Sequence, residues 1–131
     1  MIVPEEKSIF NTYSQDLRYL YQLRVGLSPL RAHKHRHNFL DTPSDICTCN
    51  SGVETTVHYL LYCPLFVTHR EELMEIVQPI LNSTPNVDDL VMSHILLYGK
   101  KALNPTQNRE ILNATLDYIR NTGRFSFDSE S

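Results

Sequence analysis

Apolar side chains recur at steps of three and four residues along most of the chain, which is the pattern of helices that bury one face. An alternation with a period of two, which would indicate strands, is weak throughout. The sequence therefore predicts a mainly α fold, a small helical domain with irregular connections. Helices are expected at residues 17–24, 30–37, 57–61, 65–80, 87–98 and 105–122.

Residues with special backbone preferences mark the expected ends of the first two helices. Thr12 or Ser14 can cap the first helix, and Gly26 can end it. Ser28 followed by Pro29 is a strong start signal, because serine is a good N-cap and proline fits the first helical position. Each of these helices thus has a local chemical reason for where it begins.

Prolines and glycines limit the later helices in the same way. Pro64 disfavours the helical conformation at Cys63, so the short helix should end there. Pro79 should end or kink the long helix that contains it. Asn104 can open the last helix, and Gly123 stands at a natural C-terminal position.

The expected helices fit one compact domain. A chain of 131 residues lies within the usual size of a single hydrophobic core. We expect a flexible segment at residues 1–11, one helical domain at 12–124 and a frayed tail at 125–131. Within the domain, turn-forming residues make the stretch that begins at residue 41 an irregular loop.

The composition, with 41% hydrophobic and 21% charged residues, is that of a folded protein. No run approaches the ~20 apolar residues that cross a bilayer, and the first residues lack a basic and then apolar secretion signal. We therefore expect an intracellular protein, in the nucleus or the cytoplasm, with no membrane partner.

All 3 cysteines of the chain lie between positions 47 and 63, together with one histidine. The order is Cys, one residue, Cys, eight residues, His, four residues, Cys, which supplies the ligands of a closed tetrahedral zinc site. An odd cysteine count without a secretion signal favours metal binding over disulfides. The predicted ligands of a structural Zn²⁺, in a zinc loop at 41–64, are Cys47, Cys49, His58 and Cys63.

The spacing of the last two ligands is unusual for a helix. On an uninterrupted α-helix, His58 and Cys63 would be about 500° apart and would not share a face. A distortion at Pro64 could turn the Cys63 sulfur back toward the imidazole. The plain alternative is that three small buried hydrophobic residues and a helix histidine merely cluster.

Positive charge is concentrated in the N-terminal third, although the formal net charge of the chain is −3. Residues 17–40 contain five lysine or arginine side chains, three histidines and no acid, whereas residues 41–90 contain eight acids and one base. This asymmetry favours the N-terminal third as the surface for an anionic partner, RNA or DNA. The predicted phosphate contacts are Arg24, Arg31, Lys34 and Arg36.

Four short motifs, spread over most of the chain, form a further pattern. In chain order they are Leu23, Arg24, Gly26, Ser28, Pro29 and Leu30; His33, His37, Asn38 and Phe39; Cys47, Cys49, Glu54, Thr55, His58, Cys63, Pro64 and Arg70; and Asn113 to Phe125. Together they resemble the C-terminal zinc-knuckle region of the reverse transcriptase polyproteins of non-LTR (LINE-type, jockey-like) retrotransposons. Each motif alone would be weak, whereas the combination is specific.

The resemblance implies a module downstream of the polymerase, whose Cys-Cys-His-Cys zinc knuckle helps the element protein to hold template RNA or target DNA. It also implies that the chain is a fragment or a domesticated remnant of such a polyprotein. His35 departs from the family, whose members often carry an aromatic residue there, so no stacking role is assigned to it.

No enzyme activity is expected. A polymerase Tyr/Phe-x-Asp-Asp motif and an endonuclease residue set are both missing from the sequence. Asp88 and Asp89 precede an apolar run, where carboxylates normally complement the start of a helix. We therefore expect neither catalysis nor a small-molecule substrate.

Other polar and aromatic residues have both a functional and a plain interpretation. His33 and His37 share a helix face and could bind a second metal, but a third ligand is missing and a solvated basic helix is favoured. Several tyrosines could stack on single-stranded bases, although core or half-buried packing is favoured. These tyrosines are Tyr13, Tyr19, Tyr21, Tyr59 and Tyr62. The glycosylation sequon that begins at Asn82 is interpreted as a turn.

The sequence also supports a function of a different class. The zinc loop could simply fasten helices together in a structural or protein-interaction domain that binds no nucleic acid. The eight acids within residues 41–90 and the negative net charge favour this alternative, because dedicated nucleic-acid binders are usually basic.

Overall fold

The computed structural model describes residues 14–82 and 87–125, and this part of the chain is mainly helical, as the sequence predicts. Its elements are α2 (Ser14–Val25), α3 (Arg31–Arg36), the π-helix η1 (His58–Tyr62), the 3₁₀ helix η2 (Pro64–Phe66), α4 (Val67–Ile80), α5 (Asp89–Tyr98) and α6 (Pro105–Thr122). The β structure within the described residues is one isolated antiparallel bridge, between Ile46 and Val53.

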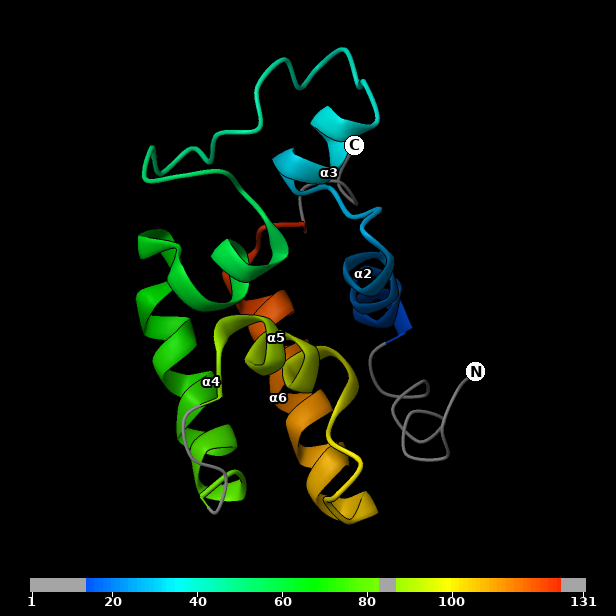
Figure 1. Cartoon of the computed structure of the whole chain (residues 1–131), viewed down its shortest axis with the longest axis vertical. Helices are drawn as coiled ribbons and strands as arrows, with labels where there is room; N and C mark the ends of the chain where they lie inside the picture. Colours follow the sequence, from blue (N-terminus) through cyan, green and yellow to red (C-terminus); the bar gives the residue numbers. More distant parts are fainter. Residues whose placement is uncertain (1–13, 83–86, 126–131) are drawn as a thin grey trace.

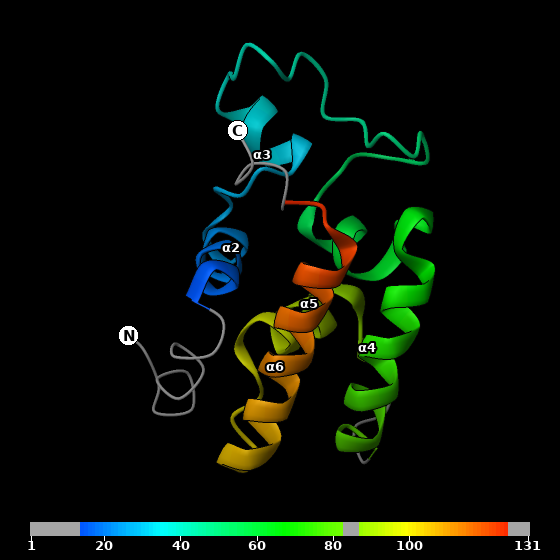
Figure 2. The ribbon, with the colours of Figure 1, turned by 180° about the vertical axis from the view of Figure 1, so that it is seen from behind.

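The last helix, α6, runs through the middle of the helical body, with α4 on one side and α2 on the other (Figure 1, Figure 2). A capping box sets its start, because the Asn104 and Gln107 side chains each accept a hydrogen bond from the other residue's amide. Gly123, with a φ of 64° in the left-handed region, sets its end. The buried face predicted from the sequence is confirmed: Ile111, Leu112, Thr115, Leu116 and Ile119.

The hydrophobic core forms where α2, α4 and α5 pack against α6. Leu20 of α2, Val77 of α4 and Leu96 of α5 are fully buried there. Burial of one such side chain contributes roughly 1.5–3 kcal/mol to stability. The core also contains the hydroxyl of Thr115, which donates to the Leu96 carbonyl at 2.7 Å and so leaves neither group without a partner.

The predicted frayed tail is wrong at its first residue, Phe125. This side chain is 1% exposed, and its ring centroid lies 5.0 Å from that of Tyr19 and 5.3 Å from that of Tyr59. Aromatic packing of this kind anchors the residue against α2 and η1. The rest of the predicted tail, the predicted flexible segment at 1–11, and the candidate residues Thr12 and Tyr13 lie outside the described residues.

The second and fourth helices begin later than predicted. α3 begins at Arg31, with Leu30 in the N-cap position. The Ser28 hydroxyl accepts a hydrogen bond from the Leu30 amide and therefore closes a turn before the helix. α4 begins at Val67, because Pro64 opens a separate 3₁₀ turn first.

Two predicted helix ends are confirmed. Pro79 lies in the last turn of α4, which ends at the following residue. The Asp88 side chain accepts a hydrogen bond from the Val91 amide and caps α5, with Asp89 in the first turn.

Among the described helices, none combines the length and the apolar character that crossing a bilayer requires.

Candidate metal centre

The first two candidate ligands lie in a tight turn of the metal-binding loop, residues 41–57. The Cys47 amide donates to the Gly52 carbonyl at 2.8 Å, and the Asn50 amide donates to the Cys47 carbonyl at 2.8 Å. Asn50 adopts a positive φ of 64°, which asparagine tolerates better than most residues. The isolated bridge closes this turn, so Cys47 and Cys49 share one short hairpin.

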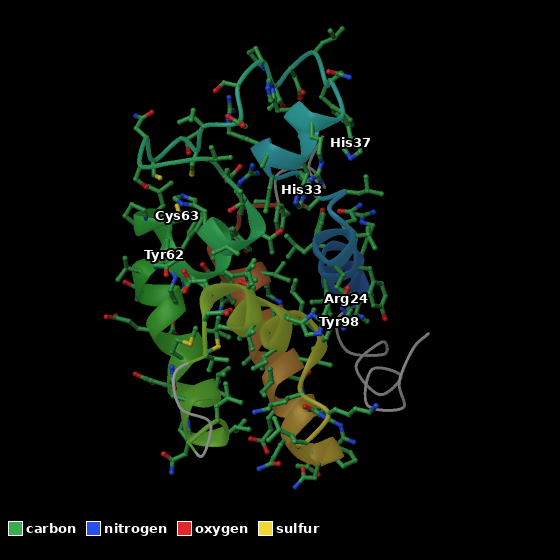
Figure 3. The ribbon with its side chains drawn as sticks, in the orientation of Figure 1. Arg24, His33, His37, Tyr62, Cys63 and Tyr98 are labelled. Carbon is green, nitrogen blue, oxygen red and sulfur yellow. The ribbon has the colours of Figure 1, made fainter. Side chains whose placement is uncertain are left out.

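The other two ligands lie at the two ends of η1. His58 is its first residue, and Cys63 follows its last residue, directly before η2 (Figure 3). The Cys63 amide donates to the His58 carbonyl at 2.7 Å, an i→i+5 hydrogen bond of the π type. This wider turn brings residues five apart to the same side, so the α-helical rotation assumed from the sequence is wrong here. Cys63 has φ −59° and ψ 120°, outside the helical region, as Pro64 predicts.

The four side chains converge on one point. Their ligand atoms all lie within 4.8 Å of one another. Cys47 Sγ lies 3.8 Å from Cys63 Sγ, and Cys49 Sγ lies 3.3 Å from His58 Nε2. Tetrahedral coordination with Zn–S bonds of about 2.3 Å places two sulfurs roughly 3.8 Å apart, whereas a disulfide needs about 2.05 Å. The predicted ligand set is therefore brought together and could hold one metal ion.

Burial and hydrogen bonding give the three thiols different proton affinities. Burial raises the pKa of Cys47 to about 12 and also raises the pKa of Cys63. The Ser51 hydroxyl and amide, which lie 2.9 Å and 3.4 Å from Cys49 Sγ, lower the pKa of Cys49 to about 6. Thiolates are the metal-binding form, so a metal ion has to displace protons from the two buried thiols.

Glu54 ties the metal-binding loop to two other parts of the chain. Its buried carboxylate accepts two hydrogen bonds of 2.7 Å from the Arg124 guanidinium and one of 2.7 Å from the Arg31 amide. One of its oxygens lies 3.9 Å from Cys47 Sγ. Burial alone would raise the pKa of Glu54, but the Arg124 ion pair and the Arg31 amide outweigh it, so the pKa is lowered. Removal of either partner of such a buried, hydrogen-bonded ion pair strongly destabilises a protein, because it leaves the other charge buried without a partner.

Arg70 of α4 supports the centre at Cys63. It donates to the Cys63 carbonyl at 2.6 Å and to the Leu60 carbonyl at 3.2 Å, and so satisfies groups at the end of η1. The sequence assigned no structural role to Glu54, Arg70 or Arg124. The signal that could have found them is their place in the retrotransposon-like motifs.

The alternative of a second metal site at His33 and His37 is not supported. Within residues 14–82 and 87–125, the group at Cys47 to Cys63 is the only set of three or more His, Cys, Asp or Glu side chains that could hold a metal, so His33 and His37 have no third ligand there. His33 is buried, and both ring nitrogens have partners within the chain: Nδ1 accepts from the Ser28 amide at 3.2 Å, and Nε2 lies 3.4 Å from the Thr56 hydroxyl. Burial lowers its pKa to about 4. The favoured interpretation of a solvated basic helix therefore holds for exposed His37 but not for His33 (Figure 3).

Arg24, one of the four predicted phosphate contacts, packs between two helices. Its Nε donates to the Leu97 carbonyl at 2.7 Å, and its guanidinium carbon lies 4.5 Å from the ring centroid of Tyr98. Figure 3 shows Arg24 of α2 beside Tyr98 of α5. Its guanidinium therefore contributes to the packing of α2 against α5.

The other three predicted phosphate contacts lie on α3. Arg31 and Lys34 line a cavity of about 430 Å³ between α3, the metal-binding loop and the end of α6. Lys34 pairs with Asp41 at 2.7 Å. Arg36 is exposed and donates to the Gly26 carbonyl at 3.0 Å. These three bases therefore share one short helix beside the metal-binding loop.

The candidate stacking tyrosines divide between core and surface. Tyr19 and Tyr59 are buried, as the plain interpretation predicts. Tyr21 is half-buried and packs against the core. Tyr62 is 55% exposed, so of these residues it alone presents most of its ring to solvent within the described part of the chain.

Comparisons with family models, with curated proteins and with solved structures find no match to this chain. The resemblance to retrotransposon reverse transcriptases therefore stays a prediction. The functional argument rests on the residues of this chain and on their geometry.

Proposed function

We propose that this chain is a non-catalytic, zinc-binding module that binds RNA or DNA, of the kind located downstream of the polymerase in non-LTR retrotransposon reverse transcriptases. The observation that carries the proposal is the position of α3. Its bases Arg31, Lys34 and Arg36 lie beside the metal-binding loop, and the Arg31 amide donates to Glu54 of that loop. The metal centre would thus position a positively charged surface.

Zinc fits the donor set best, because three thiolates and one imidazole are typical ligands of structural zinc. All coordination positions would come from the protein, which leaves none for a water nucleophile and supports a role without catalysis. The ion would contribute on the order of 10 kcal/mol to folding the loop. Free thiols in this number favour a reducing compartment, the nucleus or the cytoplasm.

Phosphate neutralisation supplies most of the affinity in unspecific nucleic-acid binding. α3 lies in the acid-free stretch 17–40, and its bases can meet a phosphate backbone. The Asp41 side chain of the Lys34–Asp41 pair is 68% exposed, so the pair stabilises the fold little and a phosphate can replace the carboxylate. Arg24 is not assigned a phosphate contact, because its guanidinium packs between α2 and α5.

A structural or protein-interaction domain is the second candidate function. The observation in its favour is the surface of α4, where both acidic and apolar side chains are exposed. Such a surface repels a nucleic acid and suits a protein partner. The exposed residues of α4 include Val67, Glu71, Glu72, Glu75 and Ile76.

Fluorescence anisotropy with short single strands of RNA and DNA, at rising salt concentrations, tests the proposal. The zinc-loaded chain should bind at low salt, and its affinity should fall as the salt rises. In a plot of log affinity against log salt, the double variant Lys34→Gln, Arg36→Gln should give a shallower decline than the wild type. The magnitude of the slope should fall by about 1.4, because each contact to a single strand contributes about 0.7.

The matched control, Lys101→Gln with Arg109→Gln, removes two exposed positive charges, one between α5 and α6 and one in α6. It should keep a slope close to that of the wild type. Absence of binding at low salt, or equal losses in both double variants, would contradict the proposal and favour the protein-interaction candidate.

A further inference from the structure

The cavity beside α3 is lined by three basic side chains and by part of the metal-binding loop. Arg31, Lys34 and Arg124 line it, together with Asp41 and Thr48. Thr48 stands between two of the metal ligands in the chain, so the metal-binding turn itself forms part of the lining. A metal ion that holds this turn would also hold the shape of the cavity.

The three basic side chains of this cavity differ in whether they have an ion-pair partner. Arg124 is paired with buried Glu54, and Lys34 is paired with Asp41. Arg31 has no ion-pair partner in the described part of the chain, and its Nε is buried there without a hydrogen-bond partner. A guanidinium in this setting is a strong donor for an anion that enters the cavity.

An aromatic side chain lies next to Lys34, one of the basic residues that line the cavity. Phe39 is 53% exposed, and Lys34 Nζ lies 5.5 Å from the centroid of its ring. The Phe39 amide donates to the Lys34 carbonyl at 3.0 Å, which fixes the backbone just after α3. Proteins hold single strands with this combination, in which a basic groove takes the backbone and an aromatic ring takes a base.

We propose that this cavity is a phosphate subsite for single-stranded nucleic acid, with Arg31 and Lys34 on the phosphate and Phe39 as the stacking platform for the neighbouring base. The inference rests on the proposed function and adds to it the class of strand and the residues that select it. Bases in a duplex stack on one another and cannot reach Phe39, so the subsite discriminates against duplexes.

Replacement of Asp41 should raise the affinity for a single strand, whereas replacement of a basic residue should lower it. Asp41 lines the cavity and accepts a hydrogen bond from Lys34, so it competes with a phosphate for the same cation. Asp41→Asn removes the competing charge and keeps the size of the side chain. Single-strand affinity should rise by up to about five-fold, the size of an exposed charge pair. A misfolded variant cannot produce such a gain.

Anisotropy titrations of the zinc-loaded chain with a single-stranded DNA and with its duplex of equal length test the subsite. Phe39→Ala should weaken single-strand binding about five-fold or more and leave duplex binding unchanged. Arg31→Gln should weaken single-strand binding and lower the salt slope by about 0.7. Tyr62→Ala removes a ring of similar exposure, 55%, outside the cavity and should bind as the wild type does.

Wild-type single-strand affinity in Phe39→Ala or in Arg31→Gln overturns the subsite, as does an equal loss in Tyr62→Ala. An Asp41→Asn variant that binds no more tightly overturns it too. If inorganic phosphate occupies the cavity but Phe39 has no influence on strands, the cavity is an anion pocket without a role in strand selection. If the wild type binds neither single strands nor duplexes at low salt, the proposed function itself fails.

Discussion

The buried histidine of α3 shows how its surroundings decide the chemistry of one side chain. His33 accepts a hydrogen bond from the Ser28 amide at Nδ1, so this nitrogen carries no proton. Burial, and then the charges of Arg36 and His37, lower its pKa to about 4, against a smaller opposing effect of Glu54. His33 is therefore neutral near pH 7 and adds no charge to the basic surface of α3.

We expect His33 to make the free energy of unfolding depend on pH. Its pKa in the folded chain is about 4, below the usual 6.5, so the unfolded chain binds the proton more readily. The contribution of His33 to stability is therefore complete above about pH 6.5 and is lost as the pH falls toward about 4.

Urea unfolding of the wild type and of His33→Gln, at about pH 7.5 and about pH 5, measures this effect. The variant keeps a polar side chain and loses the titration, so its stability should fall less between the two pH values. Acid release of the metal affects both proteins alike and cancels in the comparison. An equal fall in both proteins would contradict the assignment.

At the scale of elements, helix ends that depend on neighbouring residues are predictable from the sequence, and ends that depend on distant contacts are not. Asn104 and Gly123 act within their own turns, and both ends of α6 agree with the prediction. The start of α3 differs because the amide of Arg31, its first residue, donates to the carboxylate of Glu54, 23 residues away. η1 ends before Cys63, as the neighbouring Pro64 predicts, but the local pattern gave no sign that this helix is of the π type or that Arg70 of α4 donates to the Cys63 carbonyl.

The metal-binding loop should depend on its ion more than the helices do. No residue of the loop, 41–57, belongs to the hydrophobic core, whereas α2, α4, α5 and α6 all contribute to it. Chelation of the zinc-loaded chain should therefore speed amide hydrogen exchange within residues 41–57 and leave α5 and α6 protected. Hydrogen exchange followed by mass spectrometry measures this. Unchanged exchange in the loop after full metal release would refute the expectation.

At the scale of the whole molecule, the end of the described chain closes the fold. Phe125 packs on Tyr19 and Tyr59, and Arg124 pairs with Glu54 across 70 residues of sequence. Periodicity and capping signals are local, so they cannot reveal pairs of this separation. The ligand set of the metal centre was predictable, because three cysteines and one histidine within a short stretch already define its chemistry. The residues that hold this stretch in place come from distant parts of the chain and were not predictable in this way.

Phe125→Ala should lower the free energy of unfolding by about 3–5 kcal/mol, as removal of a fully buried phenylalanine ring usually does. Leu40→Ala, at a fully exposed position, serves as the control and should change it by less than about 0.5 kcal/mol. Urea unfolding of both zinc-loaded variants gives the comparison. If Phe125→Ala loses no more than the control, the ring does not anchor the fold.

One carboxylate, that of Glu54, lies near Cys47 Sγ and also accepts from the amide of Arg31, whose side chain lines the cavity. If the cavity binds a strand as proposed, this carboxylate links its occupancy to that of the metal centre, and such linkage is reciprocal. If the ion raises the affinity for a strand by some factor, the strand raises the affinity for the ion by the same factor. A cell poor in zinc would lose the strand-bound form before the helical body unfolds, and chains that hold a strand would keep their ion longest.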